Sequence, residues 1–201
     1  HLDKFAMELD VISKCYSDLI TSAPIPETTK QIFIDEEVKR LWENKNLPWV
    51  DSVLFFLYTG FRISEMLDLK TSDIDLQAGT MTGGTKTDAG KNRIVPIHSK
   101  IRPIVEKRFE QSKSGYLFEC EGKKMNPGQY RILWYDIMEK LKMNHTPHEC
   151  RHTFRSRLDS AGANKVCIDR IMGHKSEGTG ERIYTHKNIE ELKLNIELIT
   201  N

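Results

Sequence analysis

The chain has 201 residues, of which 38% are hydrophobic and 29% are charged, so we expect a soluble globular protein with one main core. Its net charge of +1 argues weakly against a nucleic-acid partner, but the positive charge leans toward the C-terminal half, and it need only line one face to meet phosphates. The longest apolar run, residues 53–58, is too short to span a membrane, and we expect no signal peptide.

The cysteines indicate a reducing compartment. They lie far apart and show no Cys-x-x-Cys spacing, and two of them fall in apolar periodic segments where buried free thiols are common. We therefore expect a reduced, cytoplasmic protein. The four residues are Cys15, Cys120, Cys150 and Cys167.

The N-terminal part reads as a separate segment. Residues 5–21 carry apolar side chains at helical spacing, and the stretch that follows contains Pro24 and Pro26. We expect residues 1–22 to be the terminal helix of a preceding domain, residues 23–33 a linker, and residues 34–201 the main domain. Because the chain starts at His1, we also expect it to be a piece of a longer protein.

The main domain is predicted to be mainly α with a small antiparallel β-sheet, an α+β fold. Helical periodicity and end signals first predict helices over residues 35–44, 49–58 and 63–69. Residues 75–82 and 92–97 are strand-like and punctuated by glycines, which predicts a sheet of three strands at most. Helical periodicity then returns over residues 100–111, 126–141, 147–160, 164–172 and 188–199.

Six polar residues stand in positions that favour chemistry. Most follow a glycine or lie at an element's end, and two of them are three residues apart and so share one helix face. Each alone has an ordinary reading, such as a solvated surface charge or a core tyrosine. The six are Arg62, Lys86, His148, Arg151, His174 and Tyr184.

The order and spacing of these residues resemble the tyrosine recombinase, or phage integrase, family over nearly all of residues 34–199. Each matching segment is weak alone, but five in the family's order are specific. Among members, the chain resembles most the integrases of conjugative transposons. The segments are 58–66 (YTGFRISEM), 85–87 (TKT) ahead of 95–97 (VPI), 146–154 (TPHECRHTF), 172–174 (MGH) and 184–186 (YTH).

Physical chemistry explains why these residue types belong together. Cleavage of a DNA phosphodiester gathers negative charge on the non-bridging oxygens, which the guanidinium forks of Arg62 and Arg151 can bind. A tyrosine hydroxyl, with a pKa of about 10, needs a base or positive surroundings, which His148 and the arginines can supply.

The resemblance assigns the remaining roles. It implies that Tyr184 is the nucleophile, that Lys86 gives a proton to the leaving 5′ oxygen, and that His174 hydrogen-bonds the phosphate. A 3′-phosphotyrosine link would store the bond energy, so we expect no cofactor. The implied function is a site-specific recombinase, or integrase, that integrates or excises a mobile element.

Five further residues are candidates for supporting roles. Glu65 either orients Arg62 as a supporting carboxylate or is an exposed acid in the first turn of a helix. Arg155 lies one turn after Arg151, which favours a phosphate contact over a solvated side chain. DNA contacts are also predicted for Arg157, Lys91 and Arg93.

A group of histidines and a cysteine raises the possibility of a metal site. Yet Cys150 and His152 are two residues apart and would point away from each other on a helix, and the spacing matches no zinc pattern. We therefore expect no metal. The group is His145, His148, Cys150, His152 and His174.

The expected partner is double-stranded DNA, and no membrane. The C-terminal helix over 188–199 has an apolar stripe, which either closes the chain's own core or, as the resemblance suggests, docks in trans onto a neighbouring protomer. We expect a monomer in isolation and a homo-oligomer, a tetramer, on synapsed DNA.

Other function classes remain open. A type IB topoisomerase uses a similar set of residues but nicks and relaxes DNA as a monomer. A non-catalytic DNA-binding protein on the same fold would have no need of Tyr184. A structural or protein-interaction domain explains none of the motif order.

Overall fold

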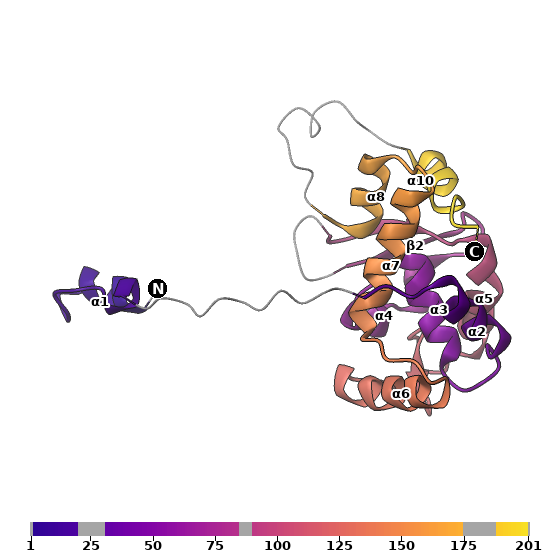
Figure 1. The fold of residues 1–201 in the computed structure, drawn as a ribbon, viewed down its shortest axis with the longest axis horizontal. Helices are drawn as coiled ribbons and strands as arrows, with labels where there is room; N and C mark the ends of the chain where they lie inside the picture. Colours follow the sequence, from indigo (N-terminus) through magenta and orange to yellow (C-terminus); the bar gives the residue numbers. More distant parts are fainter. Residues whose placement is uncertain (1, 20–30, 85–89, 175–187, 201) are drawn as a thin grey trace.

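The computed structural model describes residues 2–19, 31–84, 90–174 and 188–200. Its main body is mostly helical and carries a small antiparallel sheet, which confirms the predicted fold class (Figure 1). Among the described residues, no helix has both the length and the apolar character that crossing a bilayer requires.

The centre of the body is the helix α3, Val50–Thr59. Its apolar residues occur on every face, so it is stable only when covered on all sides. It packs along α7, Pro147–Ser160, and against α2, Asp35–Glu43. The helix ends at Gly60, which has a left-handed backbone with φ of 63° and begins the turn that leads into α4, Ile63–Asp68.

The sheet has three strands, which is within the predicted limit, and the strand-like segment 75–82 is divided between two of them. The three strands are β1, Ile74–Asp75, β2, Thr80–Gly83, and β3, Arg93–Pro96, in antiparallel order β1-β2-β3. Gly83 pairs with Arg93 at the end of the β2–β3 ladder. The predicted Lys86 belongs to residues 85–89, which lie between these two strands in the sequence and outside the described residues.

A second sheet was not predicted. β4, Glu119–Cys120, and β5, Lys123–Lys124, form a two-residue ladder whose turn residues Glu121 and Gly122 both have positive φ. Strands this short carry no alternating apolar pattern, so hydrophobic periodicity could not reveal them.

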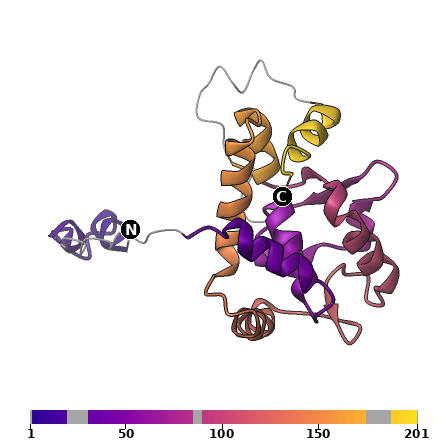
Figure 2. The same ribbon diagram turned by 45° about the vertical axis from the view of Figure 1, so that its right-hand side comes forward.

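The remaining helices complete the body. α5, Arg102–Gln111, follows the 3-10 turn η3, Ser99–Ile101, and α6, Pro127–Lys140, precedes α7. α8, Lys165–Met172, and α10, Ile189–Ile196, lie together at the end opposite α6 (Figures 1 and 2).

The C-terminal helix packs against its own chain, which is the first of its two predicted alternatives. Its residues Leu192 and Ile196, and Ile199 beyond it, are buried in the core. The carbonyl of Ile199 lies 2.8 Å from the Nε2 of His98. The same helix leaves Leu194 71% exposed.

The N-terminal segment differs from its prediction. A terminal helix was expected over residues 1–22, but the structure has α1, Leu2–Glu8, and a 3-10 turn η1, Tyr16–Leu19. Asp10 has φ of 53°, which a continuing α-helix does not allow. None of the residues in α1 is buried, so no packed face extends the helix.

Candidate active site

Arg62 stands at the N-terminal boundary of α4, immediately after the Gly60 turn. Its backbone N–H donates to Oε2 of Glu65 at 2.9 Å, and its Nη1 donates to Oε1 of the same carboxylate at 2.7 Å. Both bonds run from Arg62 to Glu65, so one carboxylate accepts from the N–H at the start of the helix and also holds the guanidinium. The sequence left two alternatives for Glu65, a carboxylate that orients Arg62 or an exposed acid. In the structure Glu65 holds Arg62.

The Glu65 carboxylate is buried and binds a second arginine. Its two oxygens accept from Nη1 and Nη2 of Arg93 at 3.1 and 2.8 Å. Burial alone would raise the pKa of Glu65, but Arg93 first, and then Arg62, bring it down to about 2. The carboxylate is therefore ionised at any pH at which the protein would act.

Arg151 joins three of the sequence motifs. From the second turn of α7 its guanidinium donates to the carbonyls of Gly60 and Met172, and its Nη2 lies 3.0 Å from Nε2 of His174. Burial, and then the charges of Arg62 and Arg93, lower the pKa of Arg151 to about 9, so it stays charged at neutral pH. The segments around residues 60, 151 and 173 thus meet at one side chain.

His174 follows the C-terminal Gly173 of α8 and faces two arginines. Burial first, and then the charges of Arg151 and Arg155, lower the pKa of His174. Arg151 can only donate, so Nε2 of His174 accepts in the hydrogen bond between them, while Nδ1 lies 3.6 Å from Oδ1 of Asp169. Asp169 is a neighbour that the sequence pattern did not single out.

We predict from this geometry that His174 titrates below its ordinary pKa of 6.5. Histidine-selective NMR across a pH series measures this directly. Arg155→Gln should raise the pKa of His174 because it removes a nearby positive charge, and Asp169→Asn should lower it further. A pKa at or above 6.5 in the unsubstituted chain would contradict the placement of the two arginines.

His148 is exposed on the first turn of α7, and its ring lies 4.7 Å from that of His152. It lines a hollow of about 410 Å³ together with Arg62 and with Arg131 from α6. The hollow therefore places a histidine and two arginines around one space. Arg131 was missed because nothing in the sequence of its helix distinguishes it from a solvated arginine.

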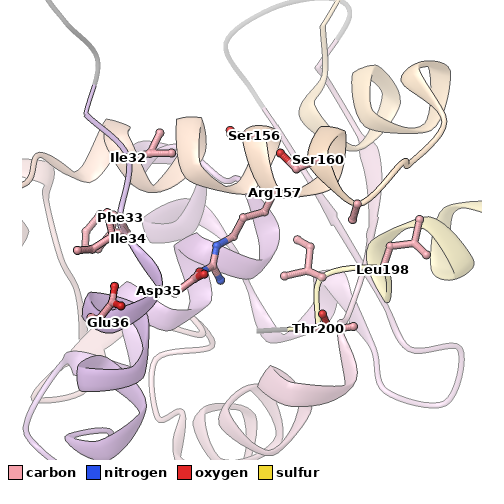
Figure 3. Close-up of a pocket in the computed structure, with 12 residues that line it drawn as sticks. Ile32, Phe33, Ile34, Asp35, Glu36, Ser156, Arg157, Ser160, Leu198 and Thr200 are labelled. Atoms are coloured by element: carbon pink, nitrogen blue, oxygen red, sulfur yellow. The ribbon is translucent and has the colours of Figure 1, made fainter.

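The predicted DNA contacts fall into two groups. Lys91 and Arg155 are exposed, and Nη1 of Arg155 lies 3.4 Å from Nδ1 of His174, beside the site. Arg157 instead reaches across to Asp35 at the edge of another pocket (Figure 3). Arg93 has a side chain only 3% exposed, so its predicted DNA contact is not supported by where it lies.

Two predicted catalytic residues, Lys86 and Tyr184, lie outside the described residues. The site that can be described consequently consists of Arg62, Glu65, His148, Arg151 and His174, with Arg93 behind them. The arginines of this set are fixed donors that can bind and polarise a phosphate, and Glu65 holds Arg62 in place.

The Gly60 turn admits no side chain. A Cβ there would lie 2.6 Å from Cδ1 of Phe154 and 2.9 Å from Sδ of Met172. We expect Gly60→Ala to lower the free energy of unfolding by about 3 kcal/mol, through left-handed backbone strain plus overpacking. Urea denaturation measures this.

Gly162→Ala is the matched control for Gly60→Ala. Gly162 also has a left-handed backbone, with φ of 77°, but a Cβ there would meet nothing within 4 Å. Only the backbone cost remains, about 1 kcal/mol. Equal losses for the two variants would show that the space around Gly60 is not tight.

Comparison with known proteins agrees with this arrangement. The family model described as phage integrase family matches residues 33–191. The tyrosine recombinase XerA of Pyrococcus furiosus is 30% identical over 194 residues, covering 90% of this chain and 66% of XerA. This chain spans 62–66% of the three archaeal XerA relatives.

Two solved structures share the fold. The Tn1549 transposon integrase in complex with circular intermediate DNA superposes with a TM-score of 0.70 at 22% identity, covering 96% of this chain and 74% of that one. A lambda integrase tetramer bound to a Holliday junction gives 0.69 at 15% identity, covering 88% and 56%. At these identities the two likenesses show a shared fold.

Proposed function

The chain belongs to the phage integrase family, the tyrosine recombinases, and on that basis we propose that it cleaves and rejoins DNA strands at specific sites. The observation that carries the proposal is the meeting of the three motifs at Arg151. Its guanidinium binds the carbonyls of Gly60 and Met172 and contacts His174, so the residues expected to hold a phosphate are gathered by one side chain.

We propose the following chemistry. The Oη of Tyr184 attacks the phosphorus, and its proton passes to His148 or to solvent. The bond from phosphorus to the 5′ oxygen breaks, and Lys86 gives that oxygen a proton. The phosphorus is then bonded to the Oη of Tyr184 and keeps its bond to the 3′ oxygen of the cleaved strand. Attack by another 5′ hydroxyl reverses these steps and releases the tyrosine, so no bond energy is lost.

The arginines would act on the charge that builds up at phosphorus. Arg62 and Arg151 are fixed before the substrate arrives, so binding the phosphate oxygens requires little reorganisation. Binding of the phosphate would replace the Arg151 contact at Nε2 of His174, so that this nitrogen carries the proton and donates to the phosphate. Arg155 and Lys91 would bind neighbouring phosphates. Arg157 is already paired with Asp35 and is left out of this set.

We propose double-stranded DNA as the partner and a tetramer on synapsed DNA as the working assembly. The lambda integrase structure was solved as such a tetramer on a junction. Because Leu192 and Ile196 are buried in cis, a neighbouring protomer would meet the outer face of α10, where Leu194 is exposed. Residues 1–22 would end a preceding core-binding domain, and the protein would act in the cytoplasm on a mobile element.

Exchange between two duplexes separates this proposal from a topoisomerase. Two duplexes of different length that carry the recognised site are incubated with the chain, and the product strands are sized on a denaturing gel. A recombinase joins strands of one duplex to strands of the other and yields products of new length. Relaxation of supercoiled DNA without such products would favour a type IB topoisomerase, and binding without cleavage would favour a non-catalytic DNA-binding protein.

A further inference from the structure

Arg93 is a charged side chain that lies behind the site and is almost fully buried. Its side chain is 3% exposed. Nη1 and Nη2 donate to the two oxygens of Glu65, and Nε donates to the carbonyl of Ile171 at 2.8 Å. One guanidinium therefore connects the start of β3, the first turn of α4 and the last turn of α8.

The surroundings of Arg93 are shaped to this guanidinium. Its Cζ lies 4.8 Å from the centre of the Phe61 ring, a cation–π contact within the protein. A Cβ at Gly84 would lie 2.5 Å from its Nη1, and a Cβ at Gly173 would lie 3.0 Å from its Cδ. Gly173 belongs to the 172–174 segment singled out in the sequence, and Gly84 directly precedes the 85–87 segment. The close fit gives both glycines a physical reason.

Glu65 connects Arg93 to Arg62, the arginine that is expected to bind the phosphate. The carboxylate is 1% exposed and holds Arg62 through both its backbone N–H and its guanidinium. Without Arg93, a buried carboxylate would keep only one charged partner and lose two hydrogen bonds. Glu65 would then be free to rotate or to take up a proton, and Arg62 would lose its fixed position.

We propose that Arg93 is a positioning residue for the strand-cleavage reaction, which acts through Glu65 to hold Arg62 and does not itself touch DNA. The proposal rests on the function proposed above. It replaces the DNA contact that the sequence suggested for Arg93. It also gives the β2–β3 hairpin a second role, because the base of the hairpin carries the side chain that orders α4.

The chain contains a matched control for this arginine. Arg108 also binds a carboxylate with two prongs, from Nε and Nη2 to Asp51 at 2.6 and 2.7 Å. It also lies over aromatic rings, those of Trp49 and Phe118. Arg108→Gln therefore breaks the same kind of ion pair on residues outside the site.

The test compares Arg93→Gln, Arg93→Lys and Arg108→Gln at a temperature where all three are folded by circular dichroism. We expect Arg93→Gln to slow single-turnover cleavage of nicked DNA by about ten- to a hundredfold, the scale of a misplaced reacting group. Arg93→Lys, which keeps the charge but not the fork, should lie between it and the unsubstituted chain. Arg108→Gln should cleave within about twofold of the unsubstituted chain.

DNA binding distinguishes positioning from direct contact. Arg93→Gln should leave Kd within about twofold and leave the slope of log Kd against log salt unchanged. A phosphate contact would lower that slope by about one. The double variant Glu65→Gln, Arg93→Gln should cleave DNA no more slowly than the slower single variant, because both substitutions act on the position of Arg62. A lowered salt slope, or additive losses in the double variant, would overturn the proposal.

A measurement without DNA tests the positioning role of Arg93 independently of the proposed strand-cleavage function. Nitrogen-15 NMR of arginine side chains reports whether rotation of the Arg62 guanidinium is restricted. We expect restriction in the unsubstituted chain and in Arg108→Gln, and its loss in Arg93→Gln. Unchanged Arg62 signals in Arg93→Gln would refute positioning. Failure of the unsubstituted chain to cleave any DNA would refute the function alone, since the NMR comparison stands without it.

Discussion

Replacing Tyr184 with phenylalanine is expected to abolish covalent attachment of the chain to DNA while leaving DNA binding nearly intact. The change removes one oxygen, the proposed nucleophile, and keeps the aromatic ring. A denaturing gel after incubation with nicked DNA should show no protein–DNA species above background. A gel-shift titration should give a Kd within about twofold, because a single uncharged hydroxyl contributes little to phosphate binding.

The other five tyrosines are poor rivals or useful controls. Burial raises the pKa of both Tyr58 and Tyr130, so neither can supply a reactive phenolate. Tyr135 on α6 is 60% exposed and offers the sharper control. Tyr135→Phe should form the covalent complex at the unsubstituted rate. Formation of the covalent complex by Tyr184→Phe, or its loss in Tyr135→Phe, would contradict the assignment of Tyr184 as the nucleophile.

Arg151→Ala should slow DNA cleavage by about a hundredfold or more, the scale of losing one fixed donor to a charged transition state. It should also destabilise the chain, because the buried carbonyls of Gly60 and Met172 would each lose a charged donor. Arg151→Lys should rescue little, since a single ammonium cannot reach both carbonyls and a phosphate.

The measurement for Arg151→Ala is single-turnover cleavage below the unfolding midpoint of the variant. The midpoint is found first by thermal denaturation, so that lost activity is not lost folding. A loss of only a few-fold in folded protein would place Arg151 outside the chemistry and leave it a purely structural link between α7, the Gly60 turn and α8.

Much of the fold followed from periodicity and end signals. The helix around residues 50–59 was predictable from its apolar residues and from the glycine at its end, which the structure shows in a left-handed conformation. The N-terminal helix was overextended because apolar spacing alone cannot show that a segment has nothing to pack against. The β4–β5 hairpin is too short for any pattern.

The part of the site that lies on a single helix could be predicted from residue spacing. Arg151 and Arg155 are one turn apart on α7, and both lie at His174. Arg157, two residues further, is rotated to another side and meets Asp35. Convergence of the segments around residues 62, 151 and 174 depends on tertiary packing, so only the resemblance to a known family could indicate it.

The sequence contains a signal for the burial of Arg93, which is its register on the strand. Residues two apart on a strand face the same side, and Arg93 shares that side with Val95, which is fully buried. Ile94, between them, is exposed instead. A charged residue on the inward register of a strand needs a buried partner of opposite charge, and Glu65 supplies it.

The most direct test of the proposed chemistry is to trap and map the covalent link. Nicked duplexes built from the DNA that flanks the gene in its source let a short 5′-hydroxyl fragment diffuse away after cleavage. The denaturant-resistant complex is digested and the DNA-bearing peptide is identified by mass spectrometry. We predict a phosphotyrosine link at Tyr184. A link at any other residue, or DNA binding without a covalent species, would contradict the proposed reaction.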